Sequence, residues 1–176
     1  TIPPPAALPV CHTCVQSAAD PARARRIGRN AKRRRVGICG ATETLLIDAA
    51  IASVLLPQIV SDLAEQGCTF KADKAARQIM PDLPAGTEQD FATEWLDAVL
   101  NVAVVDGVDE ALDHIARFGS SHTEAIVTAA EAVAARFMHG VSSAVVMWTA
   151  STPFCAGGEF GCGAEIGIAS GRSHAR

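Results

Sequence analysis

Apolar residues along this chain form short continuous runs that alternate with longer stretches of helical spacing. The runs predict buried strands at 10–15, 43–47, 68–71, 101–105, 125–127 and 144–148. The helical stretches, with Asp20-Pro21 and Asp48 as start signals, predict helices at 20–35, 48–66, 73–79, 108–118 and 129–138. Pro57 lies inside the second helix, where a proline is expected to bend or divide it. Strands that alternate with helices predict a layered α/β fold.

The composition is that of one domain with an aliphatic core. Of the 176 residues, 49% are hydrophobic but only 5% are aromatic, so Ala, Val, Ile and Leu are expected to build the core. No apolar run approaches the ~20 residues of a membrane span, and residues 1–9 do not have the pattern of a signal peptide. Six cysteines in a chain of this size do not make a disulfide scaffold, which favours a reducing compartment and therefore the cytoplasm.

The first nine residues have a composition of their own. Prolines at positions 3, 4, 5 and 9 favour an extended, non-helical lead-in. We interpret 1–9 as the remnant of a linker, and the chain, which opens on Thr1, as an excised or processed piece.

Positive charge is concentrated in one segment. Eight of the fifteen Lys and Arg residues lie at 23–35, whereas eighteen of the nineteen acids follow Arg35. Such a cluster can neutralise phosphates, so binding of nucleic acid or of an acidic partner through 23–35 is an alternative function. The segment has no aromatic residue for base stacking, and a charged helix face is usually solvated, which is the interpretation we prefer. A helix packed on the core would be expected to carry more apolar residues than Ala24, Ile27 and Ala31.

Three residues near the start of the chain have the spacing of a metal knuckle. Cys11 and Cys14 are separated by two residues, one of which is His12. A zinc site needs two further ligands at comparable spacing, and Cys155 and Cys162 complete no such pattern. We therefore interpret the group as part of a packed strand and predict no metal site.

Cys39 is the candidate nucleophile. It stands between Gly37 and Gly40, directly ahead of an apolar run. Small neighbours let a substrate and backbone N–H groups approach a thiol closely, as acyl chemistry requires. A single cysteine in an apolar chain can equally be a small core residue, because reactivity depends on a lowered pKa. The local sequence leaves both interpretations open.

The segment around Cys39 contains Asn30, Ala31, Lys32 and the run 43–46. Together with Cys39, these residues resemble the cysteine segment of γ-glutamyl phosphate reductase, a member of the aldehyde dehydrogenase superfamily. The likeness recurs in order along the chain at 11–12, 93–97, 114–115, 119–123, 150–154, 157–161, 163–167 and 174–176. So many collinear matches are more specific than any single motif.

The resemblance implies a fold and an activity. We expect a three-layer α/β/α catalytic domain of the aldehyde dehydrogenase type at 10–176, truncated at its C-terminus and without the cofactor-binding domain. The activity implied is the reduction of L-glutamyl 5-phosphate by NADPH to L-glutamate 5-semialdehyde, in proline biosynthesis, through a thioester on Cys39. The resemblance also implies a small-molecule substrate and a homodimer formed through the catalytic domain.

The same resemblance assigns site residues. It implies substrate contacts for Glu43, Ser151, Thr152, Gly157 and Gly158, and it places Glu94 at the nicotinamide ribose. Three polar residues usual in the family are replaced by Ser142, Thr149 and Ala156, which affects substrate recognition more than the fold. We expect little or no reductase activity from the isolated chain, because the NADPH-binding fold and an asparagine oxyanion donor belong to the part of the enzyme that has no counterpart here.

Overall fold

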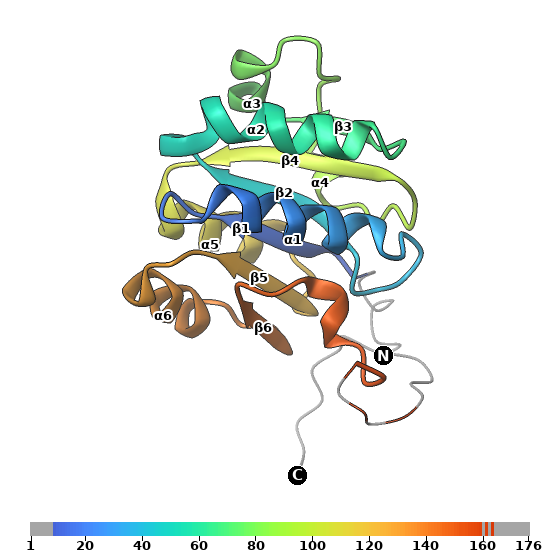
Figure 1. Cartoon of the computed structure of the whole chain (residues 1–176), viewed down its shortest axis with the longest axis vertical. Helices are drawn as coiled ribbons and strands as arrows, with labels where there is room; N and C mark the ends of the chain where they lie inside the picture. Colours follow the sequence, from blue (N-terminus) through green and yellow to red (C-terminus); the bar gives the residue numbers. More distant parts are fainter. Residues whose placement is uncertain (1–8, 160, 162, 164–176) are drawn as a thin grey trace, which may run out of the picture.

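A six-stranded parallel sheet forms the centre of the computed structural model, which describes residues 9–159, 161 and 163 (Figure 1). The strands are β1 (Cys11–Val15), β2 (Thr42–Asp48), β3 (Thr69–Ala72), β4 (Val99–Val105), β5 (Thr123–Val127) and β6 (Val145–Trp148). Their order in space is β3-β4-β2-β1-β5-β6, and every neighbouring pair is parallel. The first strand of the chain therefore lies inside the sheet, between β2 and β5.

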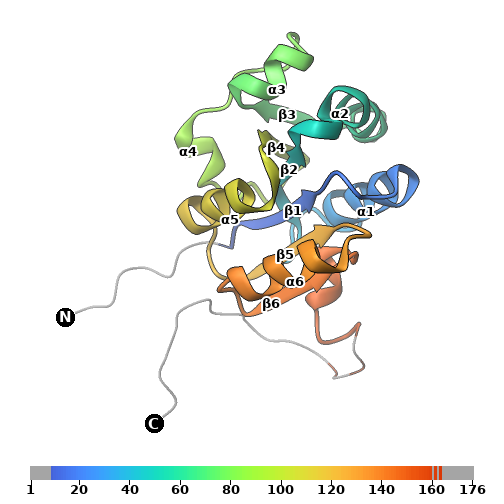
Figure 2. The same ribbon diagram turned by 90° about the vertical axis from the view of Figure 1, so that its left-hand side faces the viewer.

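Helices cover both faces of this sheet (Figure 2). One face carries α1 (Pro21–Arg33) and α2 (Ala49–Ala64), and the opposite face carries α5 (Gly107–Phe118) and α6 (Glu131–Gly140). Two short helices, α3 (Lys74–Ile79) and α4 (Glu88–Phe91), lie between β3 and β4 in the sequence. The predicted three-layer α/β/α fold is confirmed.

Successive side chains of a strand point to opposite faces of the sheet, so the sheet divides the core into two halves. Leu45 and Ile47 of β2 pack with the residues under α1 and α2, whereas Leu46 packs with those under α5 and α6. Because both faces are covered, all seven residues of β2 are buried, and the strand reads as a continuous apolar run. This is why apolar runs identified the strands to within about two residues of their observed ends.

Aspartates begin three of the helices, two of them at the predicted start signals. Asp20 accepts a hydrogen bond from the Arg23 N–H, Asp48 from the Ala50 N–H, and Asp73 from the Ala76 N–H. Helix α2 is continuous through Pro57, so the proline does not divide it. The four-residue helix α4 was not predicted, because it is too short to show a period.

The basic helix α1 keeps Arg23, Arg26 and Arg29 exposed, but its other side packs on the core. It buries Ala24, Gly28, Ala31 and Lys32, and it packs against α2. Small residues replace the large apolar ones that packing was expected to need: a Cβ added to Gly28 would lie 3.7 Å from Ile59 Cγ2. The contact with α2 also includes Ile27, which packs against the same core, and Arg25, which is paired with Asp62.

The rest of the domain prediction falls largely outside the described residues. Of the linker remnant proposed at 1–9, only Pro9 is described, and residues 164–176 of the proposed domain are not. In the part of the chain that is described, no helix combines the length and the apolar character needed to span a membrane.

Candidate active site

Cys39 lies in the turn that joins α1 to β2. This turn is at the end of the sheet where the two central strands, β1 and β2, begin. The Cys39 side chain is half-buried, three residues before the first residue of β2. Its carbonyl oxygen accepts a hydrogen bond from the thiol of Cys11, the first residue of β1, at 3.1 Å. The turn is thus held against the start of both strands, with the candidate nucleophile at the sheet edge.

The segment after β6 packs directly on this turn. A 3₁₀ helix, η1 (Thr152–Cys155), follows Ser151, and the hydroxyl of Thr152 is hydrogen-bonded to that of Thr42 at 2.9 Å. A Cβ added to Gly40 would lie 2.7 Å from the Cys155 Sγ and 3.3 Å from the Thr152 carbonyl oxygen. Glycine at position 40 is therefore what allows η1 to approach the turn. The structure thus brings the predicted substrate residues Ser151 and Thr152 beside the Cys39 turn.

The loop before β4 reaches the turn from the other side. A Cβ on Gly37 would lie 3.9 Å from the Leu96 carbonyl oxygen, and the Leu96 N–H donates to Glu43 Oε1 at 3.4 Å. This loop carries Glu94, which is half-buried and has no hydrogen-bond or ion-pair partner among the described residues. Burial raises the pKa of the Glu94 carboxyl above its ordinary value. Its assigned contact with the nicotinamide ribose stays a prediction.

Glu43 is buried and paired within the protein. Its Oε2 lies 2.7 Å from Lys32 Nζ, and both side chains have at most 1% exposure. Burial raises the pKa of Glu43 to about 7, against the opposing effect of the Lys32 charge. The carboxylate thus joins α1, β2 and the Leu96 loop. Its assigned contact with the substrate stays a prediction.

The predicted glycine pair follows η1 in an irregular loop. Gly157 is half-buried and Gly158 is exposed. The next residue, Glu159, forms an ion pair with Arg34, whose guanidinium also lies over the Phe154 ring at 5.2 Å. These contacts hold the loop near the C-terminal end of α1. Phe160 and Cys162, within the family-like glycine segment, lie outside the described residues.

A buried polar pair at the same edge of the sheet was missed from the sequence. His12 Nδ1 lies 2.9 Å from Glu124 Oε2, which also accepts the His12 backbone N–H, and both side chains are fully buried. The His114 ring stands edge-on to that of His12, with 5.5 Å between centroids. The one signal for this pair in the sequence was Glu124, a carboxylate directly before the buried strand predicted at 125–127. Nowhere in the described chain do three or more His, Cys, Asp or Glu side chains gather as metal ligands.

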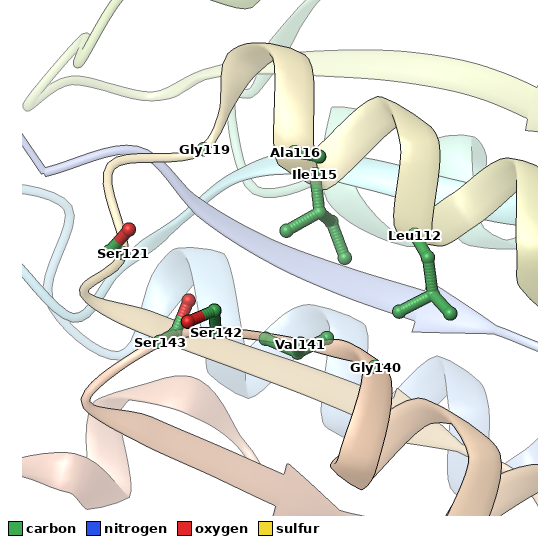
Figure 3. A pocket seen from close by; sticks show the side chains of 9 residues that line it. All are labelled: Leu112, Ile115, Ala116, Gly119, Ser121, Gly140, Val141, Ser142 and Ser143. Carbon is green, nitrogen blue, oxygen red and sulfur yellow. The ribbon is translucent and has the colours of Figure 1, made fainter.

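A pocket of about 240 Å³ opens on the opposite face of the sheet from α1 (Figure 3). Figure 3 shows the hydroxyl groups of Ser121, Ser142 and Ser143 on one side of it and the apolar side chains of Leu112 and Ile115 on the other. Ser142 is one of the positions where the sequence departs from the family pattern. None of the predicted site residues lines this pocket.

Comparisons with known proteins identify relatives that match almost the whole chain. No family model matches the chain. It is 68% identical over 165 residues to the γ-glutamyl phosphate reductase of Gluconobacter oxydans, and 66% identical over 165 residues to that of Acidiphilium cryptum. Each match covers 94% of this chain and 39% of the relative, so the chain spans about two fifths of the length of these reductases.

Solved structures give the same result for the fold. The γ-glutamyl phosphate reductase of Thermotoga maritima matches with a TM-score of 0.92 and 41% identity, over 96% of this chain and 41% of that one. An acetylating aldehyde dehydrogenase of Geobacillus thermoglucosidasius matches with a TM-score of 0.65 over 92% of this chain and 44% of that one, at 19% identity, and so shows the fold alone. The chain therefore resembles γ-glutamyl phosphate reductase, of which it matches about two fifths, and has the fold that this reductase shares with aldehyde dehydrogenases.

Proposed function

We propose that the chain is the cysteine-bearing catalytic domain of a reductase that converts L-glutamyl 5-phosphate into L-glutamate 5-semialdehyde in proline biosynthesis. The observation that carries this proposal is the 68% identity to a protein named γ-glutamyl phosphate reductase. A half-buried cysteine next to Gly40, in the turn before β2, supports it. We expect the protein to act in the cytoplasm and to associate as a homodimer through this domain.

In this proposal the Cys39 thiolate attacks the carbonyl carbon of the acyl phosphate. The bond from that carbon to the phosphate oxygen then breaks, inorganic phosphate leaves, and a thioester on Cys39 remains. NADPH would supply a hydride to the thioester carbon. The resulting thiohemiacetal collapses to the aldehyde and restores the Cys39 thiolate, so that one difficult reduction is divided into easier steps.

The residues of this chain supply positioning and charge stabilisation. The Cys39 backbone N–H is a candidate donor to the oxyanion that forms on the substrate carbonyl oxygen. Ser151, Thr152, Gly157 and Gly158 are proposed as substrate contacts. For Ser151 the support is a buried hydroxyl that has no partner among the described residues.

Two carboxylates complete the proposed site. Glu94, half-buried and without a described partner, would accept hydrogen bonds from the nicotinamide ribose of NADPH. Glu43 is proposed as a substrate contact, and its ion pair with Lys32 holds it in position.

The structure offers little support for the alternative, nucleic-acid binding through 23–35. Lys32 is buried against Glu43, Arg25 is paired with Asp62, and Arg34 is paired with Glu159. Three of the eight basic side chains are therefore already neutralised within the protein. A binder of phosphates would be expected to keep them available.

Site-resolved alkylation with iodoacetamide tests the proposal. Cys155 is the matched control, since it is half-buried and packs on the same turn. We expect Cys39 to react faster than Cys155 at pH 7, and excess substrate to slow its labelling. Equal rates for the two thiols, with no protection by substrate, would overturn the assignment of Cys39. The chain alone should show little or no NADPH oxidation, and robust turnover would contradict its expected inactivity.

A further inference from the structure

Two cysteines lie on either side of the contact between η1 and the turn before β2. Cys155 is the last residue of η1, and Cys39 belongs to the turn. Both side chains are half-buried, whereas the other described cysteines, Cys11, Cys14 and Cys68, are buried. Among the cysteines that the structure describes, Cys39 and Cys155 are therefore the pair that a small reagent in solution can reach.

The sulfur of Cys155 lies close to the backbone next to Cys39. A Cβ added to Gly40 would be 2.7 Å from the Cys155 Sγ. Since neighbouring Cα atoms are about 3.8 Å apart, this contact puts the Cys155 Sγ at most about 8 Å from the Cys39 Cα. A disulfide needs Cα atoms about 4–7 Å apart. A bond between the two sulfurs therefore requires rotation of both side chains and a shift of the turn or of η1.

The buried thiol of Cys11 lies against the same turn. It donates a hydrogen bond to the Cys39 carbonyl oxygen at 3.1 Å. Burial and then the Glu124 charge raise the pKa of Cys11, and thiolates at Cys155 and Cys39 raise it further. Both half-buried thiols are thus within electrostatic range of one buried thiol, which supports their grouping in one cluster. Because the thiolate is the reactive form, Cys11 itself is not expected to take part in chemistry there.

The element that carries Cys155 is better able to shift than the sheet is. η1 is a single turn of 3₁₀ helix, a form with poorer hydrogen-bond geometry than an α-helix. It is followed by an irregular segment that contains Gly157 and Gly158. A small movement of η1 towards the turn therefore disrupts no strand or long helix.

Cys155 is not one of the residues that resemble the reductase family. It lies between the family-like segments 150–154 and 157–161 and belongs to neither. The proposed reductase reaction uses one thiol, that of Cys39. A second thiol beside the candidate nucleophile is thus a feature of this chain that the proposed function leaves unexplained.

We propose that Cys39 and Cys155 form a reversible disulfide when a hydroperoxide oxidises Cys39. The Cys39 thiolate attacks one oxygen of hydrogen peroxide, the O–O bond breaks, water leaves, and the sulfur becomes a sulfenic acid. The Cys155 thiolate then attacks the Cys39 sulfur, the S–O bond breaks, and a second water leaves. In total the two thiols lose two electrons and two protons, and one peroxide becomes two waters. A dithiol reductant reverses the bond by thiol–disulfide exchange.

This disulfide protects the candidate nucleophile. A sulfenic acid without a nearby thiol is oxidised further to sulfinic acid, which thiols do not reduce, whereas a disulfide returns to two thiols. Disulfides in a reducing compartment are usually transient and redox-sensing, which agrees with the expected cytoplasmic location. While the bond is present, covalent chemistry at Cys39 is blocked.

Peptide mapping of the peroxide-treated chain tests the proposal. The chain is exposed to hydrogen peroxide at pH 7, quenched with iodoacetamide in urea, and digested without reductant by trypsin and glutamyl endopeptidase. Peptides 36–43 and 137–159 then carry Cys39 and Cys155 as their single cysteines. We expect these two peptides as a linked pair that dithiothreitol separates. Linkage of 36–43 to the peptide of Cys11 or Cys162, or sulfinic acid at Cys39 without linkage, would overturn the proposal.

The bond must also form within one chain. In an equal mixture of ¹⁴N- and ¹⁵N-labelled chains, an intrachain disulfide gives linked pairs of a single isotope. Pairs that combine the two isotopes would show a bond between chains and would overturn the assignment.

Two variants separate Cys155 from the other thiols. In Cys155→Ala, peroxide should abolish iodoacetamide labelling of Cys39, and dithiothreitol should not restore it, because Cys39 passes to sulfinic acid. The parent chain should recover this labelling with dithiothreitol. Cys68→Ala is the matched control, since it removes a thiol next to β3, away from the turn, and should recover as the parent does. Equal recovery in Cys155→Ala and the parent would overturn the role of Cys155.

Failure of this proposal is distinguishable from failure of the proposed function, because the disulfide needs a reactive Cys39 but no substrate. If substrate slows alkylation of Cys39 while peroxide gives no linked pair, the disulfide is refuted and the proposed function stands. If the linked pair forms while substrate gives no protection, the disulfide stands and the assignment of Cys39 to the reductase reaction fails.

Discussion

Lys32 Nζ lies 2.7 Å from Glu43 Oε2, with both side chains buried. Lys32 is near the end of α1 and Glu43 is the second residue of β2, so the pair spans the turn that carries Cys39. The sequence analysis placed the lysine in a solvated basic segment and predicted that the glutamate contacts the substrate. In the structure each is the other's partner, and together they hold both ends of the turn.

Lys32→Met is expected to destabilise the chain strongly. Removing one member of a buried ion pair leaves the other charge uncompensated, at a cost of about 3–5 kcal/mol. Without Lys32, the pKa of Glu43 should rise further, because the lowering effects of the Lys32 charge and hydrogen bond are lost while burial still raises it. The folded state then ionises this carboxyl at higher pH than the unfolded state, so the variant loses stability as pH rises.

Urea unfolding at pH 5 and pH 8 measures this effect. The difference from the parent chain should be larger at pH 8. The control is Lys32→Met/Glu43→Gln, which has no carboxyl at position 43 and should lack the added pH dependence. A destabilisation by Lys32→Met that is the same at both pH values would show that Glu43 is not the group affected.

Cys11 and Cys14 are expected to resist alkylation in the folded chain. Burial raises the pKa of Cys14 to about 12, and burial followed by the Glu124 charge raises that of Cys11 well above its ordinary value. The thiolate is the reactive form, so both should be labelled only when the protein opens. Peptide mass analysis with increasing urea should show both thiols reacting together with global unfolding. Labelling of Cys14 in the absence of urea would refute this.

Gly40→Ala should destabilise the chain, and a second substitution, Cys155→Ala, should restore most of the lost stability. The new Cβ would lie 2.7 Å from the Cys155 Sγ, which forces η1 or the turn to shift. Overpacking of this kind costs about 1–3 kcal/mol. Cys155→Ala removes the nearest obstructing atom, so Gly40→Ala/Cys155→Ala should recover most of the loss in thermal unfolding. If the double variant is no more stable than the single one, the clash with the Thr152 carbonyl oxygen at 3.3 Å dominates instead.

His114 is expected to contribute to acid sensitivity. Burial, and then the charges of His12 and Arg117, lower the pKa of His114 from 6.5 to about 3. Between those values the unfolded state binds a proton that the folded state does not, so stability falls as pH decreases from about 6.5 towards 3, by up to about 1.4 kcal/mol per pH unit. His114→Leu removes this group. Unfolding free energies of the two proteins should converge or cross as pH falls, and parallel curves would contradict the shifted pKa.

Local patterns predicted all the strands and all the α-helices except the four-residue α4, and long-range pairing accounts for most of what they missed. The strands were visible because a parallel sheet covered on both faces buries nearly all residues of its inner strands, as in β2. The position of Cys39 in a turn before β2 was equally local. No such pattern links His12 to Glu124, which are 112 positions apart. Nor does a local pattern reveal that Lys32 is buried while the neighbouring arginines are not. Packing by Gly28 and the Ala residues of α1 was missed because small side chains have no apolar signature.

The central place of β1 also has a consequence for synthesis. Its partners are β2, which begins at Thr42, and β5, whose Glu124 lies opposite His12. At about 5–20 residues per second, the ribosome needs roughly 5–20 s after β1 before β5 exists. During that interval the nascent chain displays an unpaired strand edge, a template for association with other chains. Chaperone binding to nascent chains should therefore peak before residue 127 emerges and fall once β5 has paired with β1.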